Sequence, residues 1–216
     1  MLLELFDWGF EARTLQVIFG LALGVVFGIA AQLSRFCLRR AVAGAPDERG
    51  SAGAVWVVAL ASAIVGFLLA SSWGYVDLGG HRYLDRDLPY LAIALGGIAF
   101  GAGMVLTRGC VSRLSVLGAT GNMRAVTVLI VFAVVAHATL KGVLAPLRTT
   151  LGSVTTALPF GSLRDLPLGA PVASALGVVA AVYLIKRFRP AWRDVAAGVV
   201  IGLIPVVGWA TTSVLL

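Results

Sequence analysis

The two cysteines of this 216-residue chain each end a similar phrase. Residues Phe27–Cys37 read FGIAAQLSRFC, and residues Phe100–Cys110 read FGAGMVLTRGC. An arginine follows three positions after each cysteine, at Arg40 and Arg113, which places it on the cysteine's side of a helix. A nearby guanidinium favours a thiolate and attracts anions, so the spacing suits thiols that contact a small anion.

The similarity of the two phrases extends beyond the cysteines. Gly24–Arg40 aligns with Gly97–Arg113 and is identical at seven of seventeen positions. An apolar composition explains matched glycines and leucines, but it does not explain two cysteines and two pairs of arginines in one register. We therefore predict an internal repeat with units of about 14–50 and 90–124, a construction common in membrane transporters.

Ser34 and Thr107 occupy equivalent positions, each directly before an arginine. We expect their hydroxyl groups to cap a short new helix where each span ends. A broken or re-entrant helix is tolerated at membrane depth only when protein surrounds it or when it lines a polar cavity. The sequence therefore predicts short helices that hold the sulfur atoms inside the protein. The candidate substrate-pathway residues are Cys37, Cys110, Arg40, Arg113, Arg35, Arg108, Ser34 and Thr107.

Each of these features also has an ordinary structural explanation. A free cysteine often serves only as a small buried residue, and arginines at a cytoplasmic helix end serve membrane orientation. The shared register with Arg40 and Arg113 favours function. Asn122 and His137 are weaker candidates, because Asn122 could cap a span and His137 could hydrogen-bond at the outer interface.

The composition predicts an all-α polytopic membrane protein. Hydrophobic residues make up 59% of the chain and charged residues 12%, and apolar stretches of about twenty residues recur along it. We predict one transmembrane domain, 1–216, in which the fourth span must include Asn122 and Met123, or residues after Lys141, to cross a bilayer. The six predicted spans are Thr14–Leu33, Ser51–Trp73, Tyr90–Thr107, Ala125–Leu140, Pro167–Ile185 and Val195–Leu216.

The net charge of +7 is distributed unevenly between the loops. Segments after the first, third and fifth spans carry eleven basic residues, whereas the N-terminus and the other loops carry six basic and seven acidic residues. The positive-inside rule makes the basic segments cytoplasmic and places the N-terminus outside. The charge thus reflects orientation, and we expect membrane lipid rather than nucleic acid as the surrounding partner.

Enzyme signatures are missing from the sequence. It contains no phosphate-binding loop, no zinc-ligand spacing, no paired carboxylates within a span and no Ser-His-Asp set. We therefore expect a protein that is not an enzyme and that has no cofactor and no metal site.

Two motifs resemble a known family. Ser34–Ala41 reads SRFCLRRA and Gly97–Arg113 fits GxxFGxGMxLTRGCVSR; both are similar to the YeeE/YedE sulfur-transport family of bacterial inner-membrane proteins. The resemblance implies uptake of thiosulfate, with Cys37 and Cys110 on a path that passes the ion inward through transient S–H···S contacts.

The chain departs from this family pattern in one respect. Full-length relatives continue into a second half with a third functional cysteine, whereas this sequence has two cysteines and ends at Leu216. We expect a shortened or incomplete member whose path is completed by a further copy, a second transporter subunit or additional sequence.

Two other functions stay open on the sequence alone. The protein could be a membrane thiol or sulfur-relay redox protein in which the cysteines react covalently. It could instead be a non-transporting membrane subunit that anchors a sulfur-metabolism partner through the outer loop Lys141–Leu166.

Overall fold

The computed structural model describes residues 12–75, 89–155 and 169–215. Within these ranges the chain forms nine α-helices and no strand. The helices are α2 (Ala12–Leu33), α3 (Leu38–Ala43), α4 (Pro46–Ser72), α5 (Tyr90–Leu106), α6 (Val111–Ala119), α7 (Met123–Lys141), α8 (Ala145–Ser153), α9 (Gly169–Phe188) and α10 (Trp192–Leu215).

Among the described residues, six segments are long and apolar enough to span a membrane, which confirms the predicted all-α polytopic class. Two of these segments, Thr14–Ala43 and Tyr90–Ala119, each combine a long helix with the short helix that follows it. The predicted fourth span is completed at its N-terminus, because α7 begins at Met123. Pro167, the predicted start of the fifth span, lies outside the described residues.

The second span begins earlier than predicted, at Pro46 rather than Ser51. Proline suits the first helical position, since its fixed φ matches the helix and its missing N–H has no intrahelical partner there. Asp47 and Glu48 follow in the first turn, where negative charge interacts favourably with the helix dipole. The apolar pattern identified the membrane part of α4 but missed this polar first turn.

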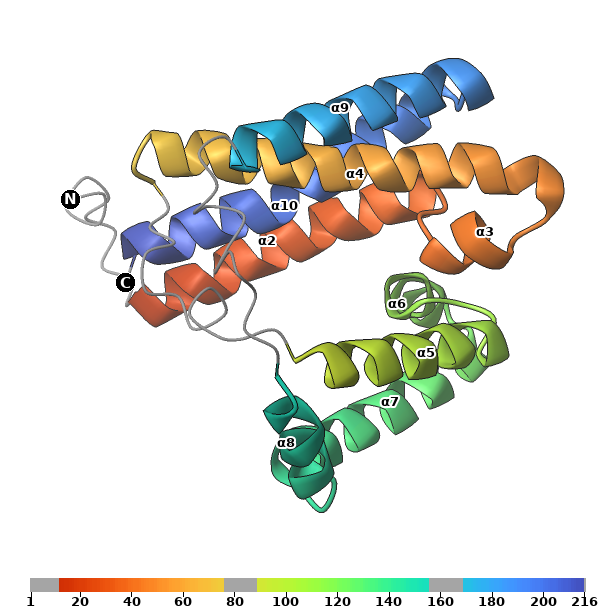
Figure 1. The fold of residues 1–216 in the computed structure, drawn as a ribbon, viewed down its shortest axis with the longest axis vertical. Helices are drawn as coiled ribbons and strands as arrows, with labels where there is room; N and C mark the ends of the chain where they lie inside the picture. The colour runs from red at the N-terminus through yellow and green to blue at the C-terminus, as the bar shows by residue number, and fades with distance from the viewer. Residues whose placement is uncertain (1–11, 76–88, 156–168, 216) are drawn as a thin grey trace.

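The helices form two bundles (Figure 1). In the first bundle, α4 packs against α3, α9 and α10, and α10 also packs against α2. In the second bundle, α7 packs against α6 and α8, and α8 also contacts α5. Contacts of α2 with α6 and of α3 with α5 join the bundles, so the short helices α3 and α6 lie where the two bundles meet.

Close helix approach holds the first bundle together. A Cβ atom added to Gly202 of α10 would collide with the backbone oxygen of Ala59 in α4. One added to Gly198 would lie 3.0 Å from the backbone oxygen of Val55. Small residues at these positions let the two backbones approach, as is common between membrane helices. The buried core around this contact includes Ala31, Val55 and Ile201.

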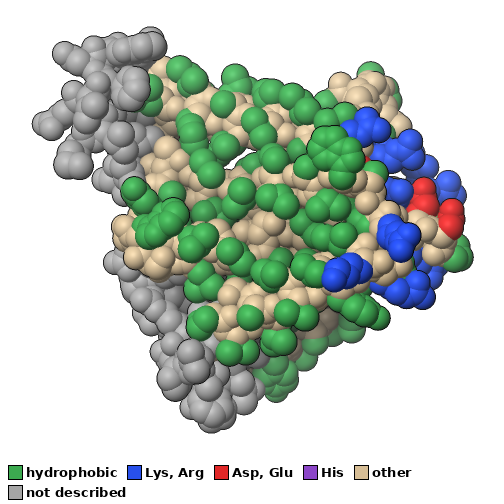
Figure 2. Space-filling model, turned by 90° about the horizontal axis from the view of Figure 1, so that it is seen from above, with side chains coloured by type: hydrophobic (Ala, Val, Ile, Leu, Met, Phe, Trp, Pro, Cys, Tyr) green, Lys and Arg blue, Asp and Glu red, His purple; other side chains and the backbone are tan. Residues whose placement is uncertain are grey.

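The surface reflects the membrane environment. Figure 2 shows hydrophobic side chains spread over the visible face, with Lys and Arg side chains gathered at one end of the molecule. Many large apolar side chains are exposed along the spans, such as Ile98 in α5 and Val134 in α7. This pattern suits helices that contact lipid along their length and water at their ends.

Candidate functional site

A pair of buried thiols lies at the junction of the two bundles. The Sγ atom of Cys110 is 3.6 Å from the Sγ atom of Cys37, and the Cys110 thiol donates a weak hydrogen bond to the Cys37 sulfur. The exposed fractions of the two residues are only 7% for Cys37 and 5% for Cys110, and both are free cysteines. Met104 and Leu38 complete the apolar surroundings. The fold thus brings together two residues that are 73 positions apart in the sequence.

The same backbone geometry positions both cysteines. A long helix ends, an arginine takes a left-handed conformation (φ 49° at Arg35 and 59° at Arg108), and an extended cysteine then precedes the short helix. A left-handed conformation costs a non-glycine residue about 1–3 kcal/mol and persists only where the surroundings enforce it. Its presence at two equivalent positions shows that the break between the long and the short helix has the same defined geometry in both segments.

The predicted helix caps at Ser34 and Thr107 are wrong. The Ser34 hydroxyl donates back to the Ala30 carbonyl oxygen at 2.7 Å, and the Thr107 hydroxyl donates to the Gly103 carbonyl oxygen at 2.8 Å. Both hydroxyls therefore bond back to the preceding helix, and the Thr107 hydroxyl also lies 3.0 Å from the Gly109 carbonyl oxygen that follows it. The N-cap residues are the cysteines, and neither makes a side-chain capping hydrogen bond.

The two paired arginines have carboxylate and amide partners. Arg40 binds both carboxylate oxygens of Glu48, at 3.1 Å from Nε and 3.3 Å from Nη2. Arg113 donates from Nη1 to Gln32 Oε1 at 3.1 Å, which links α6 of the second bundle to α2 of the first. Each arginine thus helps to position the short helix that begins with its cysteine. Within the described residues, no hydrogen bond joins either guanidinium to a sulfur atom.

The remaining predicted residues make no hydrogen bond with the thiols among the described residues. Arg35 and Arg108 are exposed. Asn122 caps α7 as predicted, since its side-chain oxygen accepts a hydrogen bond from the backbone N–H of Ala125 at 3.2 Å. His137 is exposed near the other end of α7, about 22 Å along the helix from Asn122. The structure therefore does not group His137 with the cysteine pair.

Two buried donors near Cys37 were missed by the sequence analysis. In the described part of the chain, Arg39 Nε and Trp56 Nε1 are the buried side-chain nitrogen or oxygen atoms that have no hydrogen-bond partner. Trp56 stacks on Phe36, directly before Cys37, with ring centroids 5.3 Å apart. Arg39 belongs to the basic phrase after Cys37, but Trp56 gives no sequence signal because it is one apolar residue in an apolar helix.

Among the described residues, no three His, Cys, Asp or Glu side chains gather at one place. The site itself offers two thiols in an apolar setting, with the Arg39 and Trp56 N–H donors nearby.

The six apolar spans of the described residues and the buried pair of thiols define a polytopic membrane protein with a sulfur-containing site. A family model described as "Sulphur transport" matches residues 33–215, which is most of the chain. The chain therefore belongs to this YeeE/YedE sulfur-transport family, as its two cysteine phrases indicated. No curated protein and no solved structure gives a match. The family is one of transport proteins, which favours a transporter of sulfur compounds over an enzyme.

Proposed function

We propose that this protein takes up thiosulfate across the bacterial inner membrane, with Cys110 and Cys37 as adjacent contact sites on the path. The observation that carries the proposal is the 3.6 Å separation of the two buried sulfur atoms. A thiol is a weak hydrogen-bond donor and a soft, polarisable group, which suits the terminal sulfur of thiosulfate. Two weak sites in contact let an ion move from one to the other without being trapped.

The N–H donors around the cysteine pair support anion binding. Arg39 Nε and Trp56 Nε1 flank the Cys37 segment and have no acceptor among the described residues. A buried donor without an acceptor costs about 1–3 kcal/mol, and an anion on the path would remove that cost. The N-terminus of α6 adds further favourable potential, since its first turn has no side-chain cap.

The orientation follows from the basic residues. Both cysteines lie at the C-terminal ends of α2 and α5, next to basic residues such as Arg39 and Arg113. Lys and Arg gather at one end of the molecule (Figure 2). The positive-inside rule makes this end cytoplasmic and the N-terminus external. In this orientation, the cysteine pair acts late on the inward path.

The electrical work of uptake must be supplied. Each negative charge moved inward costs about 2.3 kcal/mol per 100 mV of inside-negative potential. A thiosulfate dianion therefore requires about 4.6 kcal/mol at that potential. We propose that a co-transported cation or proton, or rapid consumption of thiosulfate inside the cell, supplies this work.

The equivalent breaks between the long and short helices support an internal repeat as part of this proposal. The Ser34 and Thr107 hydroxyls bond back to equivalent carbonyls, and Arg35 and Arg108 share the left-handed conformation. A related second copy or subunit would extend the path in the same way as a repeat does within the chain.

The test is uptake of radiolabelled thiosulfate into cells that lack other sulfate and thiosulfate importers. Cells with the unmodified chain should accumulate label, and Cys110→Ala should abolish accumulation. Ser115→Ala is the matched control, because Ser115 is exposed on the same short helix and its hydroxyl donates to the Val111 carbonyl oxygen. Failure of the unmodified, membrane-inserted chain to accumulate label would refute transport by this chain alone. Equal competition by sulfate, which lacks the terminal sulfur, would refute the role of the thiols.

The same sulfur separation favours a second candidate, a sulfur relay. In that reaction, a Cys110 thiolate attacks the terminal sulfur of thiosulfate, the new S–S bond makes a cysteine persulfide, and the old S–S bond breaks to release sulfite. Mass spectrometry of the protein after exposure to thiosulfate separates the two functions. A persulfide on Cys37 or Cys110 supports the relay, whereas unchanged thiols during uptake support transport.

A further inference from the structure

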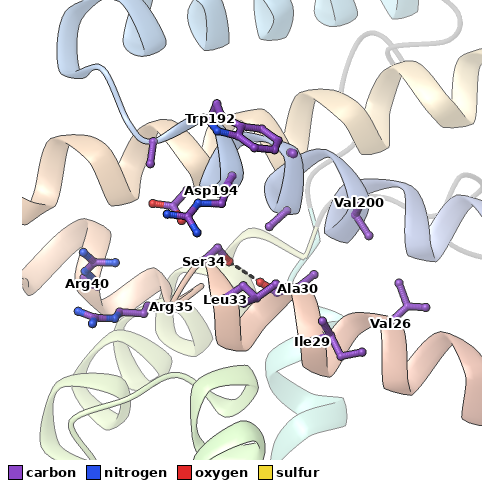
Figure 3. A pocket seen from close by; sticks show the side chains of 14 residues that line it. Val26, Ile29, Ala30, Leu33, Ser34, Arg35, Arg40, Trp192, Asp194 and Val200 are labelled. Carbon is purple, nitrogen blue, oxygen red and sulfur yellow. Dashed lines mark hydrogen bonds between the residues drawn. The ribbon is translucent and has the colours of Figure 1, made fainter.

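A pocket of about 750 Å³ opens between α2 and α10, and neither cysteine lines it. Figure 3 shows that its lining changes character along its length. Val26 and Ile29 of α2 lie with Val200 of α10 at the apolar end, and Leu33 lies beside Ser34, nearer the polar end. Arg35, Arg40, Trp192, Arg193 and Asp194 form the polar end.

The polar end has one positive charge in excess. The charge of Arg40 is balanced by Glu48, which accepts two hydrogen bonds from it. Arg35 and Arg193 are exposed, and the structure gives neither side chain a hydrogen bond or ion pair within the described residues. Asp194 offsets one of these two charges, so the pocket suits a ligand with a single negative charge.

The apolar end requires a ligand with a hydrocarbon part. The residues from Val26 to Leu33 extend the pocket by about 10 Å along α2, away from the basic end. These apolar side chains make no favourable contact with a small hydrated anion. An acyl chain bound against them gains van der Waals contacts that loosely packed lipid does not make. Trp192, which is 77% exposed at the start of α10, is a residue type enriched at the level of lipid headgroups.

We propose that this pocket binds one anionic phospholipid of the cytoplasmic leaflet. The phosphate lies between Arg35 and Arg193, Trp192 packs at headgroup level, and one acyl chain lies along Val26 to Leu33. Basic pockets between transmembrane helices on the cytoplasmic side are a known way of binding anionic headgroups. The assignment depends on the basic end being cytoplasmic and does not depend on what the cysteine pair transports.

The test is native mass spectrometry of the full chain in mild detergent during titration with phosphatidylglycerol. Arg193→Gln should weaken binding of the first lipid by about fivefold, since one basic contact near a headgroup contributes about 1 kcal/mol. Arg193→Lys keeps the charge and should restore most of the affinity. Ala196→Trp should weaken binding by blocking the apolar wall, and Ala196 is exposed, so the fold should accept the larger side chain.

Two controls decide between a defined site and general attraction. Arg124→Gln removes an exposed basic residue of the second bundle that does not line the pocket, so it should leave the first binding event unchanged. Phosphatidylcholine with the same acyl chains should bind more weakly. The proposal is wrong if Arg124→Gln and Arg193→Gln act equally, if phosphatidylcholine binds equally well, or if inorganic phosphate or thiosulfate displaces the lipid. None of these readouts requires uptake activity.

Discussion

The segments that carry Cys37 and Cys110 share a backbone but not their surroundings. In each, a left-handed arginine and an extended cysteine separate a long helix from a short one. Around Cys37, however, Phe36 stacks on Trp56 of α4, and Arg40 pairs with Glu48 of the same helix. The first segment is therefore anchored to the closely packed first bundle.

The second segment has fewer such anchors. Gly109 takes the position of Phe36, so no aromatic ring can stack there. The polar contact of Arg113 crosses to Gln32 in the other bundle instead of staying within its own. Ser112 Oγ lies 3.7 Å from the Cys110 sulfur, which gives this thiol a second polar neighbour.

The two segments show which features depend on the shared backbone and which depend on the neighbouring side chains. The backbone places a sulfur atom at the start of each short helix. The surroundings then tie Cys37 to α4 through Phe36 and Arg40, and they tie the Cys110 segment to α2 through the Arg113–Gln32 contact. The contact between the two sulfur atoms therefore joins two differently anchored segments.

The largest expected effect comes from oxidative cross-linking of this pair. Diamide should oxidise the two thiols to a disulfide. The oxidant takes up the two protons and two electrons and is reduced to its hydrazine. The sulfur atoms need to move from 3.6 Å to about 2.05 Å for the bond to form. A protease site placed between residues 76 and 88 provides the readout, because the cut halves should stay joined on a non-reducing gel and separate with a reductant.

Cys37→Ala provides the control for that experiment, since its cut halves should separate under both conditions. Rapid cross-linking that a reductant reverses would support the close approach of the two thiols, and a reversible loss of thiosulfate uptake would support their role in transport. Cut halves that separate after oxidation of the unmodified chain would contradict the close sulfur contact.

The next effect distinguishes the packing of the two bundles. Gly202→Ala should reduce the free energy of unfolding by about 1–3 kcal/mol, because the new Cβ collides with the Ala59 backbone in α4. Gly97→Ala in α5 should be neutral or stabilising by about 0.5–1 kcal/mol, because nothing lies within 4 Å of its added Cβ. Thermal unfolding in detergent measures both, and equal destabilisation would show that the second bundle is as closely packed as the first.

A smaller effect tests the donor found only beside Cys37. Trp56→Phe keeps a ring to stack on Phe36 and removes the unpaired indole N–H. If this N–H contacts the transported anion, the apparent KM for thiosulfate should rise by about fivefold, equivalent to about 1 kcal/mol, with little change in maximal rate or folded yield. Trp73→Phe, at an exposed position after α4, is the matched control. Identical KM values for both variants would remove Trp56 from the path.

The sequence was sufficient to predict the class of fold and the family. Apolar stretches of spanning length leave few alternatives to membrane helices, because every backbone group must be paired inside the bilayer. Asn122 was predicted as a cap for the same local reason that makes it one. Such predictions depend on residues close together in the sequence.

The sequence-based predictions were wrong or incomplete where contacts between distant residues determine the conformation. Ser34 and Thr107 have the right residue type for N-caps, but their hydroxyls bond to the preceding helix because the following arginines turn the chain. The distance between Cys37 and Cys110 depends on how two bundles pack, and no local pattern encodes it. The role of Trp56 beside Phe36 depends on the same packing.

The smallest effect compares the helices that follow the two short ones. α7 is capped by Asn122, whereas α4 follows Ala45, which has no side-chain cap and an extended backbone (φ −64°, ψ 148°). Asn122→Ala should therefore lower stability by about 1 kcal/mol, and Ala45→Ser should raise it by a similar amount. Thermal unfolding of both variants and of the double variant measures the two changes in the free energy of unfolding. These changes should add, because the sites lie on different helices. A loss of stability with Asn122→Ala but no gain with Ala45→Ser would show that Pro46 and the acidic first turn already stabilise the start of α4 fully. The two cysteine segments would then differ in how the next helix begins, as well as in what surrounds their thiols.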